Sequence, residues 1–187
     1  FYAAFALMMA GLIGMAGSSD FFNFFAFWEL MSSWALYVAL VHEENEDARR
    51  EAFKYFIFNT VGASFMFLGI AMFGSAAGSF AFADVAKGAP AMSTAWAGGA
   101  LVLVLVGMLM KAAMLPVRID YQMHPATAPT PVSGYISAML LKSGPYGVLK
   151  LMVLFGGATL VDRLGLIDGQ SLLGNAIAII GGVTVLY

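Results

Sequence analysis

Residues 98–115 read GGALVLVLVGMLMKAAML, an apolar run in which Lys111 is the one charged side chain. A helix needs about 20 mostly apolar residues to cross roughly 30 Å of hydrocarbon. The stretch that follows, from Pro116 to Pro131, holds four of the chain's six prolines and cannot form one continuous helix. An apolar helix followed by a proline-rich break indicates a helix that is interrupted at membrane depth.

The composition extends this interpretation to the whole chain. Hydrophobic residues make up 61% of it and charged residues 11%, against roughly 25% charged in an average soluble domain. Apolar runs separated by short polar hinges predict an all-α fold: a polytopic transmembrane helix bundle that forms a single domain over residues 1–187. The expected helices cover about residues 1–17, 21–41, 53–80, 98–115, 132–155 and 172–187.

The polar connections indicate an orientation in the membrane. Residues 43–54 contain eight of the chain's twenty charged residues and are expected to be a solvated loop that opens a helix. Basic residues are commoner in the loops after the second and fourth expected helices than in the alternate loops, which places residues 43–54 in the cytoplasm. We therefore expect a multi-pass protein of the cell's inner (plasma) membrane. Because Phe1 and Tyr187 both fall within apolar runs, we also expect a fragment of a longer protein.

Charge and residue usage exclude several function classes. With 9 basic and 11 acidic residues the net charge is −2, and no basic face is available for a nucleic acid. The chain has no cysteine, which excludes disulfides, thiolate nucleophiles and iron–sulfur clusters held by this chain. Its two histidines, His42 and His124, are too far apart in sequence to suggest a metal site. A glycine-rich fingerprint for a nicotinamide or flavin is also lacking, so we expect no cofactor, no metal and no catalytic residue here.

Glu29, Lys111 and Lys142 stand out as ionisable side chains within apolar runs. From the helical rise of 1.5 Å per residue, Glu29 and Lys142 should lie roughly 12 to 16 Å inside their helices. A charge near a helix centre costs roughly 2.5 to 3.5 kcal/mol on insertion scales unless it is paired or hydrated. The structural alternatives are a Lys111 stem that reaches an interface and a protonated, hydrogen-bonded Glu29. One acid and two bases on separate helices favour a proton relay or ion path.

The proline-rich break supplies a fourth candidate. Interrupted helices at membrane depth normally line a wet cavity, although a simple kink is the alternative. His124 lies in this break and can exchange protons near neutral pH, whereas a loop histidine is otherwise an ordinary surface residue. The candidate relay therefore comprises Glu29, Lys111, Lys142 and His124. A nearby carboxylate favours the charged form of a buried lysine, so movement of Glu29 relative to Lys111 would load or release a proton.

Four sequence blocks carry a family resemblance: Phe27-Trp28-Glu29-Leu30-Met31, Lys111-Ala112-Ala113-Met114-Leu115-Pro116-Val117, Ala128-Pro129-Thr130-Pro131-Val132-Ser133 and Leu141-Lys142-Ser143-Gly144-Pro145-Tyr146-Gly147. In order and spacing they resemble the antiporter-like membrane subunits of respiratory complex I, of hydrogenases of the formate hydrogenlyase type and of Mrp-type sodium/proton antiporters. The likeness spans essentially the whole chain. It departs from the family between Arg118 and His124, where a His-x-Trp-Leu-Pro run is usual, and this argues against a close complex I orthologue.

The resemblance implies roles for the buried charges. Glu29 resembles the acid of the family's fifth helix, Lys111 the lysine of its broken seventh helix and Lys142 the lysine in the middle of its eighth. The chain then comprises one five-helix repeat and the start of the next, inverted one. The implied function is that of a proton-translocating, ion-conducting membrane subunit of a redox-driven respiratory or hydrogenase complex, itself non-catalytic. The implied partners are other membrane subunits, a peripheral redox arm, the lipid bilayer, and protons or sodium ions.

Two other functions fit the same residues. A subunit of an Mrp-type sodium/proton antiporter would use them without a redox reaction, and copurifying peripheral subunits would distinguish the two cases. A passive membrane anchor is the remaining interpretation, and the cost of several buried charges counts against it.

Overall fold

The structure is a computed structural model that describes residues 1–43, 46–114, 128–156, 166–167 and 170–186. Nearly all of these residues are helical, which confirms the expected all-α fold class, and one two-residue antiparallel pair precedes the last helix. In chain order the elements are α1 (Tyr2–Gly17), α2 (Phe21–Ser32), α3 (Trp34–Leu40), η1 (Val41–Glu43), α4 (Glu46–Ala77), α5 (Phe82–Gly88), η2 (Ala89–Ala91), α6 (Thr94–Lys111), α7 (Thr130–Tyr135), the π-helical η4 (Ile136–Leu140), α8 (Leu141–Gly156), β1 (Leu166–Ile167), β2 (Gln170–Ser171) and α10 (Leu172–Leu186).

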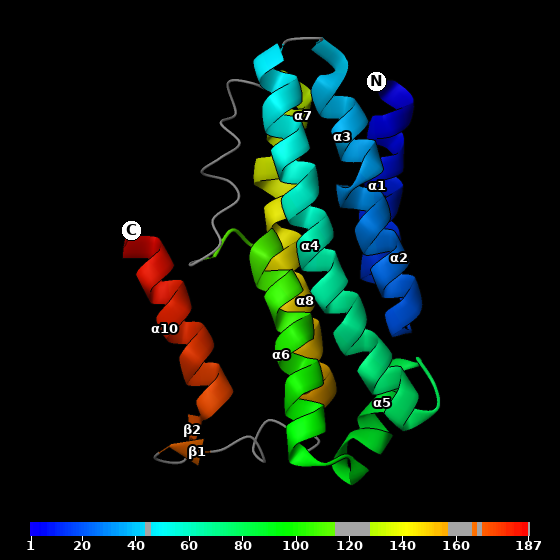
Figure 1. The fold of residues 1–187 in the computed structure, drawn as a ribbon, viewed down its shortest axis with the longest axis vertical. Helices are drawn as coiled ribbons and strands as arrows, with labels where there is room; N and C mark the ends of the chain where they lie inside the picture. Colours follow the sequence, from blue (N-terminus) through cyan, green and yellow to red (C-terminus); the bar gives the residue numbers. More distant parts are fainter. Residues whose placement is uncertain (44–45, 115–127, 157–165, 168–169, 187) are drawn as a thin grey trace.

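The long helices stand side by side along one axis, as Figure 1 shows. α4 packs most extensively against α6 and α1 against α2, while α6 also contacts α8. The rings of Phe21, Phe73 and Phe155 stack on one another and join α2, α4 and α8 in the core. α10 stands apart from these helices, and none of its described residues is buried.

α4 and α6 run antiparallel and approach each other closely where glycines lie in their contact. A Cβ atom added at Gly107 would lie 2.6 Å from the carbonyl oxygen of Gly62, so only the missing side chain permits this separation. Small residues at such contacts let the backbones of membrane helices come together. Gly62 lies about one turn after Asn59 and Gly107 about one turn before Lys111, so this contact places Asn59 and Lys111 opposite each other.

Among the described residues, three helices are long and apolar enough to cross a membrane: Glu46–Ala77, Thr94–Lys111 and Thr130–Phe155. The apolar helices Tyr2–Gly17 and Leu172–Leu186 are shorter. The expectation of six crossings therefore stays a prediction.

Two expected helices have different bounds, each for a physical reason. The expected helix over residues 21–41 is divided into α2 and α3 at Ser33, whose φ of −100° and ψ of −98° are not helical. The expected helix over residues 53–80 begins earlier, at Glu46, inside the stretch that we expected to be a loop. Glu46 and Asp47 stabilise this earlier start because negative charges in the first turn interact favourably with the helix dipole.

The ends of the other helices lie close to the expected ones. α6 begins at Thr94, where the hydroxyl of Ser93 accepts a hydrogen bond of 3.3 Å from the Trp96 amide, and it ends at Lys111 rather than at residue 115. The next described helix begins at Thr130. The predicted non-helical break, with Arg118, Asp120 and His124, falls mostly on residues 115–127, which lie outside the described residues.

Candidate functional site

Lys111 is buried inside the bundle, with 4% of its surface exposed. Its Nζ atom donates a hydrogen bond of 2.7 Å to Oδ1 of Asn59 on α4 and lies 5.8 Å from the centre of the Trp28 ring. The alternative in which the lysine stem reaches an interface does not fit this burial. The side chain that terminates α6 is therefore held inside the protein by a neutral amide and an aromatic ring.

Asn59 was not expected from the sequence as a site residue. It is 5% exposed, and its Nδ2 atom lies 3.5 Å from the carbonyl oxygen of Ser32, at the end of α2. A signal for it exists, because an amide interrupts the apolar run from Phe56 to Val61 and polar side chains in membrane helices often bond across helices. A search for charged residues does not register this signal, since the amide carries no charge.

Glu29 is half-buried on α2, and only one of its two carboxylate oxygens has a hydrogen-bond partner among the described residues. Its Oε2 atom accepts a hydrogen bond of 2.7 Å from the Ser33 hydroxyl. Its Oε1 atom is buried and has no hydrogen-bond partner among the described residues. The side chain also lines a groove of about 290 Å³ between α2 and α4, together with Thr60 and Ser64. A buried carboxylate oxygen without a donor is costly unless a proton or a water satisfies it.

Glu29 and Lys111 are coupled electrostatically without forming an ion pair. In the part of the chain that the structure describes, no salt bridge joins the two residues. Two consecutive serines, Ser32 and Ser33, connect the contacts of the two side chains. Ser33 binds Glu29, and the carbonyl of Ser32 faces the same Asn59 that binds Lys111. The expected acid–lysine pair thus exists as a short network rather than as a direct contact.

Lys142 lies apart from this network. It is exposed on α8, and its Nζ atom donates a hydrogen bond to the carbonyl oxygen of Ser137 in the preceding π-helical segment. The number of residues along a helix sets the depth of a side chain, but packing sets the face on which it lies. The structure links Glu29 and Lys111 only indirectly, through residues 32–33 and Asn59, and leaves Lys142 exposed on α8. The roles of Lys142 and of His124, which lies outside the described residues, remain proposals.

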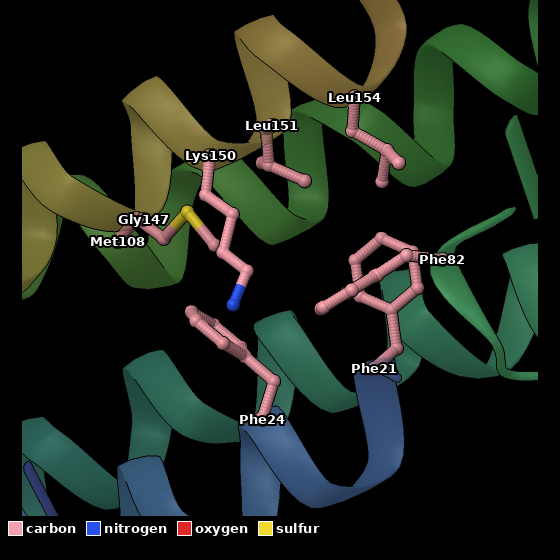
Figure 2. A pocket seen from close by; sticks show the side chains of 8 residues that line it. All are labelled: Phe21, Phe24, Phe82, Met108, Gly147, Lys150, Leu151 and Leu154. Carbon is pink, nitrogen blue, oxygen red and sulfur yellow. The ribbon is translucent and has the colours of Figure 1, made fainter. Parts of the chain in front are cut away.

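Lys150 is a second lysine on α8 that was not expected as a site residue, although it lies within an apolar run. Figure 2 shows its side chain reaching from α8 towards Phe24 and Phe82. Its Nζ atom lies 5.4 Å and 5.0 Å from the centres of these rings and donates hydrogen bonds to the carbonyl oxygens of Ala16, at 3.2 Å, and Ser18, at 2.7 Å. A cation at the carboxyl end of a helix is stabilised by the exposed carbonyls, so Lys150 fastens α8 to the end of α1.

The chemistry of these side chains suits proton exchange better than metal binding. Within the described ranges no group of three or more His, Cys, Asp or Glu residues could hold a metal ion. Glu29 combines one hydroxyl donor with one unsatisfied oxygen, and Lys111 has an uncharged acceptor. Each of the two can therefore change its protonation state without destroying a salt bridge.

Comparison with known proteins finds a family model and curated relatives that match most of the chain. A family model described as "NADH:quinone oxidoreductase/Mrp antiporter, TM" matches residues 18–180. The chain is 32% identical over 153 residues to an NADH-quinone oxidoreductase subunit of Desulforudis audaxviator, an alignment that covers 81% of this chain and 30% of that protein. It is 30% identical over 191 residues to a probable K(+)/H(+) antiporter subunit of Rhizobium meliloti, covering 100% of this chain and 35% of that one. The chain thus spans about a third of the length of these relatives.

Solved structures share the fold. An archaeal respiratory membrane complex, the membrane-bound sulfane sulfur reductase, contains a chain that aligns with a TM-score of 0.83 at 24% identity, covering 98% of this chain and 36% of that one. The Mrp complex from Dietzia sp. aligns with a TM-score of 0.68 at 25% identity, covering 81% of this chain and 29% of that one.

Proposed function

The chain belongs to the NADH:quinone oxidoreductase/Mrp antiporter transmembrane family, and from this premise we propose that it is the proton-translocating part of a membrane subunit in a redox-driven respiratory or hydrogenase complex. It is a membrane protein, and we place it in the inner (plasma) membrane. Its partners in this proposal are other membrane subunits and a peripheral redox arm. The chain itself performs no redox step, and the transported species is the proton.

One observation supports this function above the others: the ionisable side chain of Lys111 is buried at the end of a membrane-length helix and bound to a neutral amide. A buried charge in a membrane helix is expensive, and such residues mark ion or proton pathways. A passive anchor would gain nothing from this arrangement. A site that must take up and release a proton needs an ionisable group without a permanent counter-ion.

The proposed step is the loading and release of a proton at Lys111 under the influence of the Glu29 carboxylate. A nearby carboxylate favours the charged form of a buried lysine, whereas burial favours the neutral form. A change in the separation of the two side chains therefore binds or releases a proton at Lys111. We propose that the released proton continues to Lys142, with His124 as a further candidate group.

The experiment is proton uptake by vesicles that carry the assembled complex with the full-length subunit. Lys111→Ala should abolish most of the transport at unchanged membrane abundance. Lys87→Ala, in the last turn of the short helix α5, is the control and should leave transport unchanged. Near-normal transport by a well-expressed Lys111→Ala protein would return this lysine to a structural role.

A cation/proton antiporter subunit without a redox partner is the second candidate. It is favoured by the match to the probable K(+)/H(+) antiporter subunit of Rhizobium meliloti, which covers the whole of this chain. The redox-driven complex predicts that dehydrogenase-like or hydrogenase-like subunits copurify with the protein. Copurification of membrane subunits alone, together with cation-dependent proton release from the vesicles, would favour the antiporter.

A further inference from the structure

Asn59 occupies the centre of a network that joins three helices. Its Oδ1 atom accepts the hydrogen bond from Lys111 of α6, while its Nδ2 atom faces the Ser32 carbonyl at the end of α2. The last carbonyls of a helix lack partners within that helix, so the division at Ser33 makes the Ser32 oxygen available to a side chain. The amide is thereby oriented with its nitrogen towards α2 and its oxygen towards the lysine.

The position of Asn59 opposite Lys111 depends on the close contact of α4 with α6. Gly107 meets the carbonyl of Gly62 about one turn away from the two side chains, at a separation that no larger residue at position 107 would permit. The bond between Asn59 and Lys111 therefore rests on backbone packing and not on a mobile side-chain encounter.

An amide is an unusual partner for this lysine. Its oxygen accepts a hydrogen bond from an ammonium and also from a neutral amine, because both carry N–H donors. A carboxylate at the same distance would instead hold the proton on the lysine. Asn59 thus retains the Lys111 side chain in either protonation state and does not determine which state it adopts.

We propose that Asn59 is a positioning residue that holds Lys111 apart from Glu29, so that the lysine is bound without being locked into an ion pair. The inference rests on the proposed function of Lys111 as a proton carrier. The inference adds Asn59 to Glu29 and Lys111 as a third side chain of the proton site, and Asn59 acts only through the lysine. Ser33, at the same helix break, binds Glu29 through its hydroxyl.

The charged groups near Lys111 determine how clearly a substitution at Asn59 changes the protonation of the lysine. Of the titratable groups on the helices packed around Lys111, Glu29 is the one whose charge acts on it within the described residues. The remaining lysines on these helices are bound elsewhere: Lys142 and Lys150 bond to backbone carbonyls, and Lys54 pairs with Glu51.

The test is the pH profile of proton uptake in the full-length subunit within its assembled complex. Asn59→Asp keeps the shape of the side chain and adds a carboxylate at the lysine. The ammonium is then retained to higher pH, so half-maximal transport should move upward by about 1 to 3 pH units. Asn59→Leu removes the acceptor at similar volume and frees Lys111 to approach Glu29, so it should also move the profile upward. Asn59→Ser, which keeps a smaller acceptor, should shift it less than Leu does.

Two controls separate the possible causes. Asn23→Asp makes the same chemical change at an exposed position on α2 and should leave the profile unchanged. Membrane abundance is measured for each variant, and the Asp and Ser variants provide readings if the Leu variant does not accumulate.

Upward shifts for both Asp and Leu are the expected result, because a merely structural role would lower the rate at every pH without moving the profile. Unshifted profiles in all Asn59 variants, with Lys111→Ala inactive, would overturn this inference and leave the proposed function standing. Normal transport by Lys111→Ala would instead remove the proposed function itself.

Discussion

Replacement of Gly107 by alanine tests whether the contact between α4 and α6 controls the site. The added Cβ atom would lie 2.6 Å from the Gly62 carbonyl oxygen, and both partners are backbone or fixed to it. To restore an ordinary separation of 3.4 Å, the two helices must part by about 0.8 Å. If this displacement reaches the next turn, the bond of 2.7 Å between Lys111 and Asn59 lengthens beyond the range of about 2.7 to 3.2 Å that such bonds occupy.

The magnitude of the effect follows from the lost interactions. A hydrogen bond to a charged group contributes about 1.5 to 3 kcal/mol, and overpacking a well-packed contact costs about 1 to 3 kcal/mol. We therefore expect Gly107→Ala to lower proton uptake by vesicles about tenfold or more. Gly99→Ala on the same helix is the matched control, because its Cβ would meet only Met72, at 3.8 Å. Equal transport by the two variants at equal abundance would refute the idea that this contact positions Lys111.

Three further predictions concern other parts of the chain. Lys150→Met should destabilise the bundle by about 1.5 to 3 kcal/mol, because it removes charged hydrogen bonds to the carbonyls of Ala16 and Ser18. Thermal unfolding in detergent measures this loss. Leu149→Met, at an exposed position, is the control. A cysteine placed at Arg49 should react with an impermeant thiol reagent only from the cytoplasmic side. The chain has no other cysteine that would react with the reagent. Labelling from outside intact cells would mean that the orientation is opposite to the predicted one. The double variant Glu29→Gln, Lys111→Ala should transport protons only slightly more slowly than the slower of the two single variants, because both residues serve one step. If the losses of transport rate in the two single variants add in the double variant, the residues serve two separate steps.

Sequence patterns predicted the class of the fold and the unusual charges well. Long apolar runs have few alternatives to membrane helices, and a charge inside such a run is visible without any knowledge of packing. For this reason Glu29 and Lys111 could be singled out, and the structure places them in one electrostatic neighbourhood. The approximate positions of the helices follow from the same pattern.

Other features depend on tertiary contacts that a pattern does not contain. Asn59 and Lys111 are separated by 52 positions, and their hydrogen bond exists because two glycines allow α4 and α6 to meet. The exposure of Lys142 depends on how α8 is rotated about its axis, which residue counting does not determine. No proline or glycine in the second expected helix indicates that it is divided at Ser33.

That division also explains why the acid and the lysine act together without touching. In an uninterrupted helix the Ser32 carbonyl would bond to an amide one turn later, and Asn59 would have no fixed acceptor on α2. Because the helix stops there, the carbonyl orients Asn59 towards Lys111, and the next residue, Ser33, uses its hydroxyl to hold Glu29. A backbone motion at this break would move both holding groups at once. The break is therefore a point in the described structure where one backbone motion would change the separation of Glu29 from Lys111, which is the change that the loading and release of a proton at Lys111 require.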